Sequence, residues 1–171
     1  MKHSNLPHIS LQGYYQFVTF RTKESIDEYL VKLQNSDDEN RIKQQKIDHY
    51  LDNSKNGAYL YADVLEKLKE YIHSKDKDIF DLVAFSIMPN HVHILFKEIK
   101  ELKECMRIIK GGSSFMINKL LNKNGNFWAK DYYDKLIRDE KHFEIAYNYI
   151  KNNAIKTNLK DAKERFYGIY E

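Results

Sequence analysis

The pattern of apolar and polar residues predicts strands in three parts of the chain. Residues 14–20 are aromatic and β-branched with polar neighbours on both sides, which is typical of a strand. Two dense apolar segments, 79–88 and 91–96, are separated only by Pro89-Asn90, which predicts a β-hairpin. Residues 132–137 predict a further short strand.

Apolar residues at helical spacing predict the helices between these strands. The polar segment 25–53 predicts two short helices, and the apolar repeat over 60–74 predicts a helix that faces the core. Another amphipathic helix begins near residue 102. Gly111-Gly112 either interrupts or bends it before helical spacing resumes at 115–121.

The order of elements predicts an α+β fold. Strand, helical insertion and helix, hairpin, helix and strand give a ferredoxin-like sandwich, an antiparallel sheet with helices on one face. A last long helix follows from about 139 to 153, with acidic residues in its first turn. Residues 1–171 are therefore expected to form one domain. The sequence does not indicate how the aromatic segment 166–170 packs.

Composition narrows the class of protein without naming a function. The 28 Lys and Arg against 25 Asp and Glu give a formal charge of +3, too small to identify a nucleic-acid partner. The single Cys105 fits a reducing compartment. The N-terminus has no apolar signal region, and the near-apolar stretch 82–89 is far shorter than the roughly 20 residues of a membrane span. We expect a cytoplasmic protein with no membrane partner.

His91-Val92-His93 lies in the second strand of the predicted hairpin. Because strand side chains alternate between faces, both imidazoles project from one face. Two imidazoles at this spacing can chelate one metal ion. On this pattern alone, two polar residues on the solvent face of a half-buried strand are an equally good interpretation.

Tyr149 and Asn153 are four residues apart on the last predicted helix and so share one helical face. A tyrosine can act as a covalent nucleophile, but its pKa of about 10 requires help from a nearby cation or base. The chain has 13 Tyr, most of which are expected to be packing residues. Tyr132 and Tyr133 are rival nucleophiles, but they alternate faces on a strand and lack such a partner.

Three motifs together resemble one family. Residues 84–96, AFSIMPNHVHILF, closely resemble the "vMPNHvHll" signature of IS200-like single-tyrosine transposases. Residues 127–140 are similar to the family's tryptophan-containing segment, and residues 149–154, YIKNNA, to its "YIxxNP" segment. The ordered combination is typical of the branch associated with repetitive extragenic palindromes and covers roughly residues 14–159.

The resemblance implies an HUH-type, metal-dependent endonuclease and strand transferase acting on single-stranded DNA. His91 and His93 match the paired metal ligands, Asn153 matches the third ligand, and Tyr149 matches the nucleophile that forms a 5′-phosphotyrosine. The family implies Mg²⁺ or Mn²⁺, whereas imidazole ligands by themselves favour Zn²⁺ or other transition metals. Ala154 departs from the family's Pro, so this position lacks the residue that would stop the catalytic helix.

The partner that the resemblance implies is single-stranded DNA with a hairpin, or palindromic, structure. The family includes dimers, so a homodimer and a monomer both remain open. Four basic residues lie at helical spacing opposite the apolar stripe of the helix near 102, where they could follow phosphates or simply form a solvated face. They are Lys100, Lys103, Arg107 and Lys110.

Two other functions stay open at this point. A catalytically silent protein could bind a nucleic-acid hairpin through phosphates, shape and base stacking. A ferredoxin-like ribonuclease would instead depend on the 2′-OH and form no phosphotyrosine. Binding alone needs neither a nucleophile nor a metal, so the complete set of four matching residues favours the endonuclease.

Overall fold

The computed structural model describes residues 13–171, and the N-terminal segment for which we predict no signal peptide lies outside them. The strands are β1 (Tyr15–Arg21), β2 (Phe80–Ile87), β3 (His91–Glu98), β4 (Tyr133–Ile137) and β5 (Phe166–Gly168). The helices are α1 (Glu28–Gln34), α2 (Asn40–Asn53), α3 (Ala62–Ser74), α4 (Leu102–Leu121), α5 (Glu140–Lys156) and α6 (Ala162–Arg165), with a 3-10 turn at Lys23–Ser25.

Within residues 13–171 the strands form one antiparallel sheet in the order β4-β1-β3-β2-β5. The first four strands have the ferredoxin-like order, so the predicted fold class is confirmed. The hairpin prediction is also confirmed, with Ile87 opposite Val92 in the register. The aromatic tail, whose packing the sequence left open, becomes β5 and extends the sheet beside β2.

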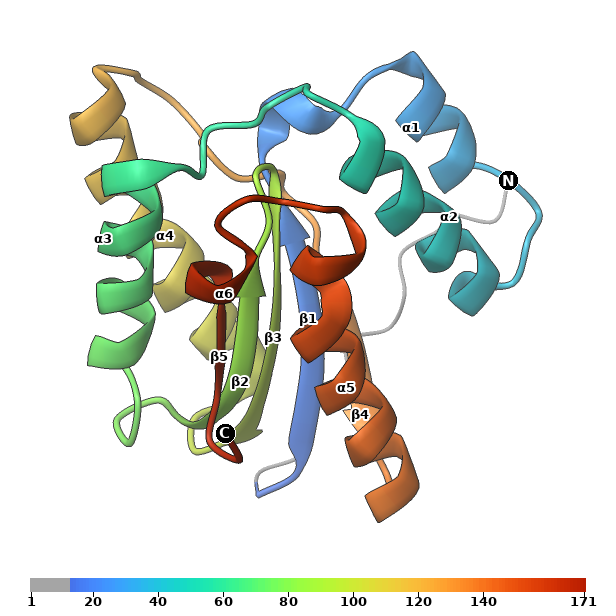
Figure 1. Cartoon of the computed structure of the whole chain (residues 1–171), viewed down its shortest axis with the longest axis vertical. Coiled ribbons are helices and arrows are strands. Elements are labelled where there is room, and N and C mark those ends of the chain that lie inside the picture. Colours follow the sequence, from blue (N-terminus) through green and yellow to red (C-terminus); the bar gives the residue numbers. More distant parts are fainter. Residues whose placement is uncertain (1–12) are drawn as a thin grey trace.

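Helices cover both faces of the sheet (Figure 1). On the face covered by α3 and α4, Phe20 and Phe96 belong to the larger core. On the other face, Phe17 and Leu95 pack with Ile150 of α5. The sequence predicted helices on one face of the sheet, and α3 and α4 form that layer. α5 forms a second layer on the other face. Alternate residues of β1 and β3 supply the two cores because strand side chains alternate.

α4 continues through Gly111 and Gly112, so of the two predicted alternatives, a break or a bend, the break is wrong. A Cβ atom at Gly112 would lie only 1.8 Å from the hydroxyl oxygen of Tyr71 on α3. That hydroxyl donates a hydrogen bond of 2.8 Å to the carbonyl oxygen of Ile108. Close packing of α3 on α4 thus offsets the low helix propensity of glycine.

α1 and α2 form a helical insertion, in agreement with the two short helices predicted there. The insertion has a small core of its own, built on Leu30, Ile47 and Leu51. The Asn90 amide donates to the carbonyl oxygen of Leu51 at 3.1 Å, which ties α2 to the β2–β3 turn. Figure 1 shows α1 and α2 at the same end of the sheet as this turn.

The C-terminal segment is fixed by a buried arginine. The guanidinium of Arg165 donates to the carbonyl oxygens of Leu60 and Ile87 and pairs with Asp161.

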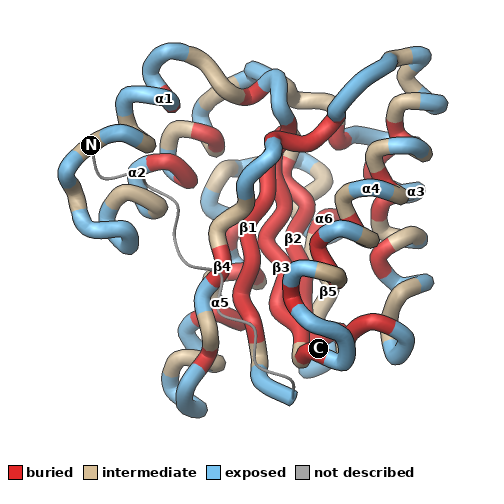
Figure 2. Tube along the Cα trace, turned by 180° about the vertical axis from the view of Figure 1, so that it is seen from behind, coloured by how far each residue is buried: buried red, intermediate tan, exposed pale blue. Residues whose placement is uncertain are grey.

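Figure 2 shows the strands buried between the helical layers, whereas much of α1 and α2 is exposed. Among residues 13–171, no helix has the length and apolar character that crossing a membrane requires.

Candidate active site

β3 places His91 and His93 on the sheet face that α5 covers. Both side chains are fully buried, and their ring centroids are 4.8 Å apart. Both imidazoles therefore lie on one face of the sheet, as predicted. The alternative of two histidines on a solvent face is wrong, because the end of the sheet is closed over by the helices.

Each imidazole is oriented through its Nδ1 atom. Nδ1 of His91 lies 2.7 Å from Oδ1 of Asn90, and Nδ1 of His93 lies 2.7 Å from Oγ1 of Thr19. An amide oxygen only accepts hydrogen bonds, so the Nδ1 of His91 carries its proton and leaves a lone pair on Nε2. The Nε2 atoms of both histidines are buried and have no hydrogen-bond partner. A hydrogen-bond partner on one ring nitrogen and a free lone pair on the other are features of metal-binding histidines.

Burial also keeps the two imidazoles neutral. It lowers the pKa of His93 to about 3 and the pKa of His91 well below its usual range. The nearby His93 and Arg21 lower the pKa of His91 further. At neutral pH both rings are therefore in the form that can bind a cation.

Asn153 is the predicted third donor of the candidate site. Its side chain is buried on α5, and its Oδ1 atom has no hydrogen-bond partner. Within residues 13–171 no group of three His, Cys, Asp or Glu side chains could hold a metal ion. The Asn153 amide is a neutral group that lies against the side chain of Tyr149. Unpaired buried polar atoms cost free energy, and a divalent cation would satisfy all three. The residues present fit such a cation.

Tyr149 faces the same site one helical turn before Asn153. Its ring centroid lies 5.2 Å from that of His93, and its hydroxyl donates a hydrogen bond of 2.8 Å to Oδ2 of Asp48. Burial and then the Asp48 charge raise the pKa of Tyr149, while the Asn153 amide acts in the opposite direction. The structure thus brings together the four residues that the motifs single out.

Two carboxylates on α2 complete the site, and neither was predicted from the sequence. Burial raises the pKa of Asp48 to about 6. Asp52, one turn further along α2, has its Oδ1 3.4 Å from Nε2 of His91. Burial and then the Asp48 charge raise the pKa of Asp52 to about 7. Their spacing of four residues was the available signal, but nothing local indicates that α2 brings them to Tyr149 and His91.

Arg21 is a further site residue that the sequence did not indicate. It pairs with His91 in the β1–β3 register, and its side chain is buried. Burial lowers its pKa, whereas the charges of Asp131 and Asp48 raise it. Its Nε atom is buried without a hydrogen-bond partner. A guanidinium in this position can donate to a phosphate oxygen.

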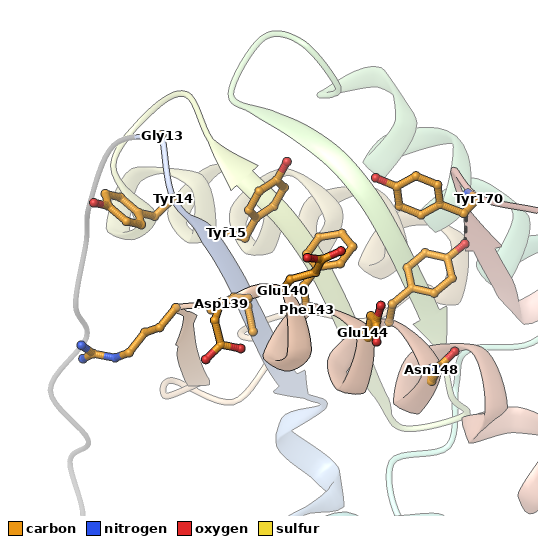
Figure 3. Close-up of a pocket in the computed structure, with 12 residues that line it drawn as sticks. Gly13, Tyr14, Tyr15, Asp139, Glu140, Phe143, Glu144, Asn148 and Tyr170 are labelled. Atoms are coloured by element: carbon orange, nitrogen blue, oxygen red, sulfur yellow. Dashed lines mark hydrogen bonds between the residues drawn. The ribbon is translucent and has the colours of Figure 1, made fainter.

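Tyr149 and Asp48 lie at a groove of about 280 Å³ between α2 and α5. β1 and β4 form its floor, and Tyr133 lines it. A second pocket, of about 700 Å³, lies at the far end of β1 around Tyr15 (Figure 3). Its lining has one cation, Arg138, against three carboxylates, those of Asp139, Glu140 and Glu144. The second pocket contains none of the site residues and its charge opposes phosphate binding.

α4, which carries three of the four predicted basic residues, covers the face of the sheet opposite Tyr149, and Lys100 precedes this helix. Only Lys110 interacts with a site residue among those described, because burial and also the charge of Arg21 lower its pKa. Lys110 donates to the carbonyl oxygens of Ala129 and Lys130, and Arg107 pairs with Glu104. Contact of Lys100, Lys103, Arg107 and Lys110 with nucleic acid stays a prediction.

The chain is similar to one known family and to a curated relative. A family model described as "Transposase IS200 like" matches residues 51–153. An uncharacterized protein of Haemophilus influenzae is 30% identical over 94 residues, covering 42% of this chain and 52% of its own length. The chain thus spans about half the length of this curated relative.

Two solved structures are also similar. One is a REP-associated tyrosine transposase bound to a REP hairpin, with a TM-score of 0.53 and 16% identity over 89% of this chain and 73% of its own. The other is a putative transposase from Deinococcus radiodurans, with a TM-score of 0.48 and 17% identity over 89% of this chain and 97% of its own. The first shows a shared fold.

Proposed function

Because the chain belongs to the IS200-like transposase family, we propose that it nicks and rejoins single-stranded DNA beside a hairpin, using Tyr149 as nucleophile. One observation carries the proposal. The hydroxyl of Tyr149 lies in a buried site with three unpartnered donors, on His91, His93 and Asn153. The DNA hairpin is proposed as substrate because a protein of the same fold is described as bound to a REP hairpin.

His91, His93 and Asn153 would hold the metal ion, for which we propose Mg²⁺ or Mn²⁺. When bound, such an ion supplies Lewis-acid stabilisation of the charge that develops on the phosphate oxygens. All three side chains are neutral, so the full charge of the cation is directed at the substrate. Asn90 and Thr19 orient the two imidazoles through their Nδ1 atoms.

The reaction needs Tyr149 to attack the phosphorus atom in line with the departing 3′ oxygen. The new bond joins Oη of Tyr149 to the 5′ phosphate, and the strand is released with a 3′-OH. Because the phosphotyrosine keeps the bond energy, a second 3′-OH can displace the tyrosine and rejoin the DNA. Arg21 can donate to a non-bridging phosphate oxygen during both steps.

Hairpin-bearing oligonucleotides labelled at either end test this function. With Mn²⁺, the label on the 3′ side of the cut should migrate with the protein on a denaturing gel, and the 5′-side label should be released. EDTA should abolish both products. Absence of any adduct over a broad set of hairpins would contradict the proposal. Equal hairpin affinity with EDTA or Mn²⁺ and no cleavage would instead identify a protein that only binds.

A further inference from the structure

We propose that Asp48 accepts the proton of Tyr149 as the phenol oxygen attacks the phosphate. This inference rests on the proposed function and adds a catalytic residue to it. Asp48 lies on the α1–α2 insertion, outside the residues 51–153 that the family model matches. The insertion would then contribute directly to catalysis.

The geometry meets the first requirement of a general base. Oδ2 of Asp48 accepts the hydrogen bond of the Tyr149 hydroxyl at 2.8 Å, within the reach that proton transfer needs. The other oxygen, Oδ1, accepts from Nε2 of Gln44, also at 2.8 Å. The side chain of Asp48 is buried. The carboxylate is therefore held on both oxygens, with one of them directed at the nucleophile.

Among the described residues, the Tyr149 hydroxyl donates to Asp48 and to no other base. The Nδ1 atom of His93 bonds to Thr19, and its Nε2 atom is a proposed metal donor. Asp52 lies beside Nε2 of His91. Burial raises the pKa of Asp48 to about 6, which makes its carboxylate a better proton acceptor than that of an exposed Asp.

The proton balance is complete in both directions. In the cut, the proton of Tyr149 moves to Oδ2 of Asp48, the Oη–phosphorus bond forms, the phosphorus–O3′ bond breaks, and the 3′ oxygen takes a proton from water. In the rejoining step, an incoming 3′-OH loses its proton to water and bonds to phosphorus. The phosphorus–Oη bond then breaks, and Tyr149 recovers its proton from Asp48.

Asp48→Asn tests the role, because an amide of the same shape cannot accept this proton. We expect the single-turnover rate of adduct formation to fall about 100-fold or more, the usual range for loss of a general base. Hairpin affinity should stay within about twofold of wild type, and Asp48→Glu should recover part of the rate. Asp63→Asn, on the exposed surface of α3, is the matched control and should react like wild type.

A second readout separates proton transfer from a structural effect. Site-specific replacement of Tyr149 by a fluorinated tyrosine gives a phenol that ionises more readily and needs less help from a base. The factor by which Asp48→Asn slows adduct formation should then be smaller by about tenfold or more, because general-base catalysis follows Brønsted behaviour. An unchanged deficit, or an Asp48→Asn protein as fast as wild type, would overturn the role of Asp48. Wild type that forms no adduct would overturn the proposed function itself.

A separate observation, the groove between α2 and α5, points to the path of the DNA. We infer that the single strand flanking the hairpin lies in this groove and so brings its phosphate to Tyr149. Arg41, Lys135 and His142 line the groove, and Asp48 is the one carboxylate among its described lining residues. The exposed Ile145 and the ring of Tyr133 offer apolar surface for bases. Arg41 and Lys135 can pair with phosphates while Ile145 and Tyr133 pack against bases, which matches single-stranded DNA.

Arg41→Ala with Lys135→Ala tests this path through binding alone, so it does not depend on cleavage. Affinity for a hairpin with a single-stranded flank should fall, and the slope of log affinity against log salt should lessen by about 0.7 for each phosphate that is no longer neutralised. Lys67→Ala with Lys119→Ala, on α3 and α4, is the control and should change neither. Unchanged affinity, or an equal decrease for a blunt hairpin without a flank, would overturn the inference.

Discussion

Thr19 holds His93 from the neighbouring strand: Oγ1 of Thr19 lies 2.7 Å from Nδ1 of His93, and the two residues are opposite each other in the β1–β3 register. The hydrogen bond fixes the ring so that its Nε2 atom points away from Thr19 and remains without a partner. β1 therefore contributes to the candidate metal site without supplying a ligand.

Removing this hydroxyl should weaken metal binding. Thr19→Val keeps the volume of the side chain and frees the imidazole, and removal of such a supporting hydrogen bond typically costs about 10-fold or more in metal affinity. Titration of Mn²⁺ into the metal-free protein, followed by calorimetry, measures the effect. Ser74→Ala removes a hydroxyl at the end of α3 and should bind Mn²⁺ like wild type. A Thr19→Val protein with wild-type affinity would show that the Thr19 hydrogen bond does not support metal binding at His93.

Tyr149→Phe should abolish adduct formation while hairpin affinity stays within about twofold of wild type, because only the nucleophilic oxygen is removed. Tyr132→Phe is the matched control. Its ring lies under Lys110 and packs on the core formed with α3 and α4, and it should keep its activity. Adduct formation by Tyr149→Phe would refute the assignment of the nucleophile.

The buried carboxylate of Asp48 should make stability depend on pH. Its pKa is raised from 3.8 to about 6 in the folded protein, so its contribution to stability is present below pH 4 and is lost as pH rises through 6. Two pKa units correspond to about 3 kcal/mol. Relative to wild type, Asp48→Asn should thus gain about 3 kcal/mol in unfolding free energy between pH 4 and pH 8. Urea unfolding of the metal-free proteins at both pH values measures it, and a constant difference would contradict it.

The two glycines of α4 should respond in opposite ways to alanine. A Cβ at Gly112 would collide with Tyr71, whereas nothing lies within 4 Å of a Cβ at Gly111. Gly112→Ala should destabilise the protein by about 1–3 kcal/mol, the usual cost of overpacking. Gly111→Ala should stabilise it by about 0.5–1 kcal/mol through helix propensity. Thermal unfolding measures the stability of both variants, and equal changes in unfolding temperature would contradict the packing argument.

Local sequence patterns were sufficient for much of the fold and for part of the site. The turn at Pro89-Asn90 defines the hairpin, strand alternation places His91 and His93 on one face, and helical spacing places Tyr149 beside Asn153. Each of these relations spans only a few residues. They do not require knowledge of how distant elements pack.

The remaining site residues depend on packing between distant segments. Asp48 and Tyr149 are 101 positions apart, and the polar sequence of α2 does not indicate which of its side chains face the sheet. Amphipathicity likewise shows that Lys103 lies away from the core that α4 covers. It does not show that this core is on the face of the sheet opposite Tyr149.

Peptide mapping of the covalent adduct tests the central claim most directly. Wild type is incubated with Mn²⁺ and a hairpin oligonucleotide, digested with nuclease and trypsin, and analysed by tandem mass spectrometry. The tryptic peptide 142–151 contains both Tyr147 and Tyr149, so fragment ions between the two residues are needed. We predict a 5′-phosphonucleotide on Tyr149. A nucleotide on Tyr132, Tyr133 or Tyr147 would contradict the account.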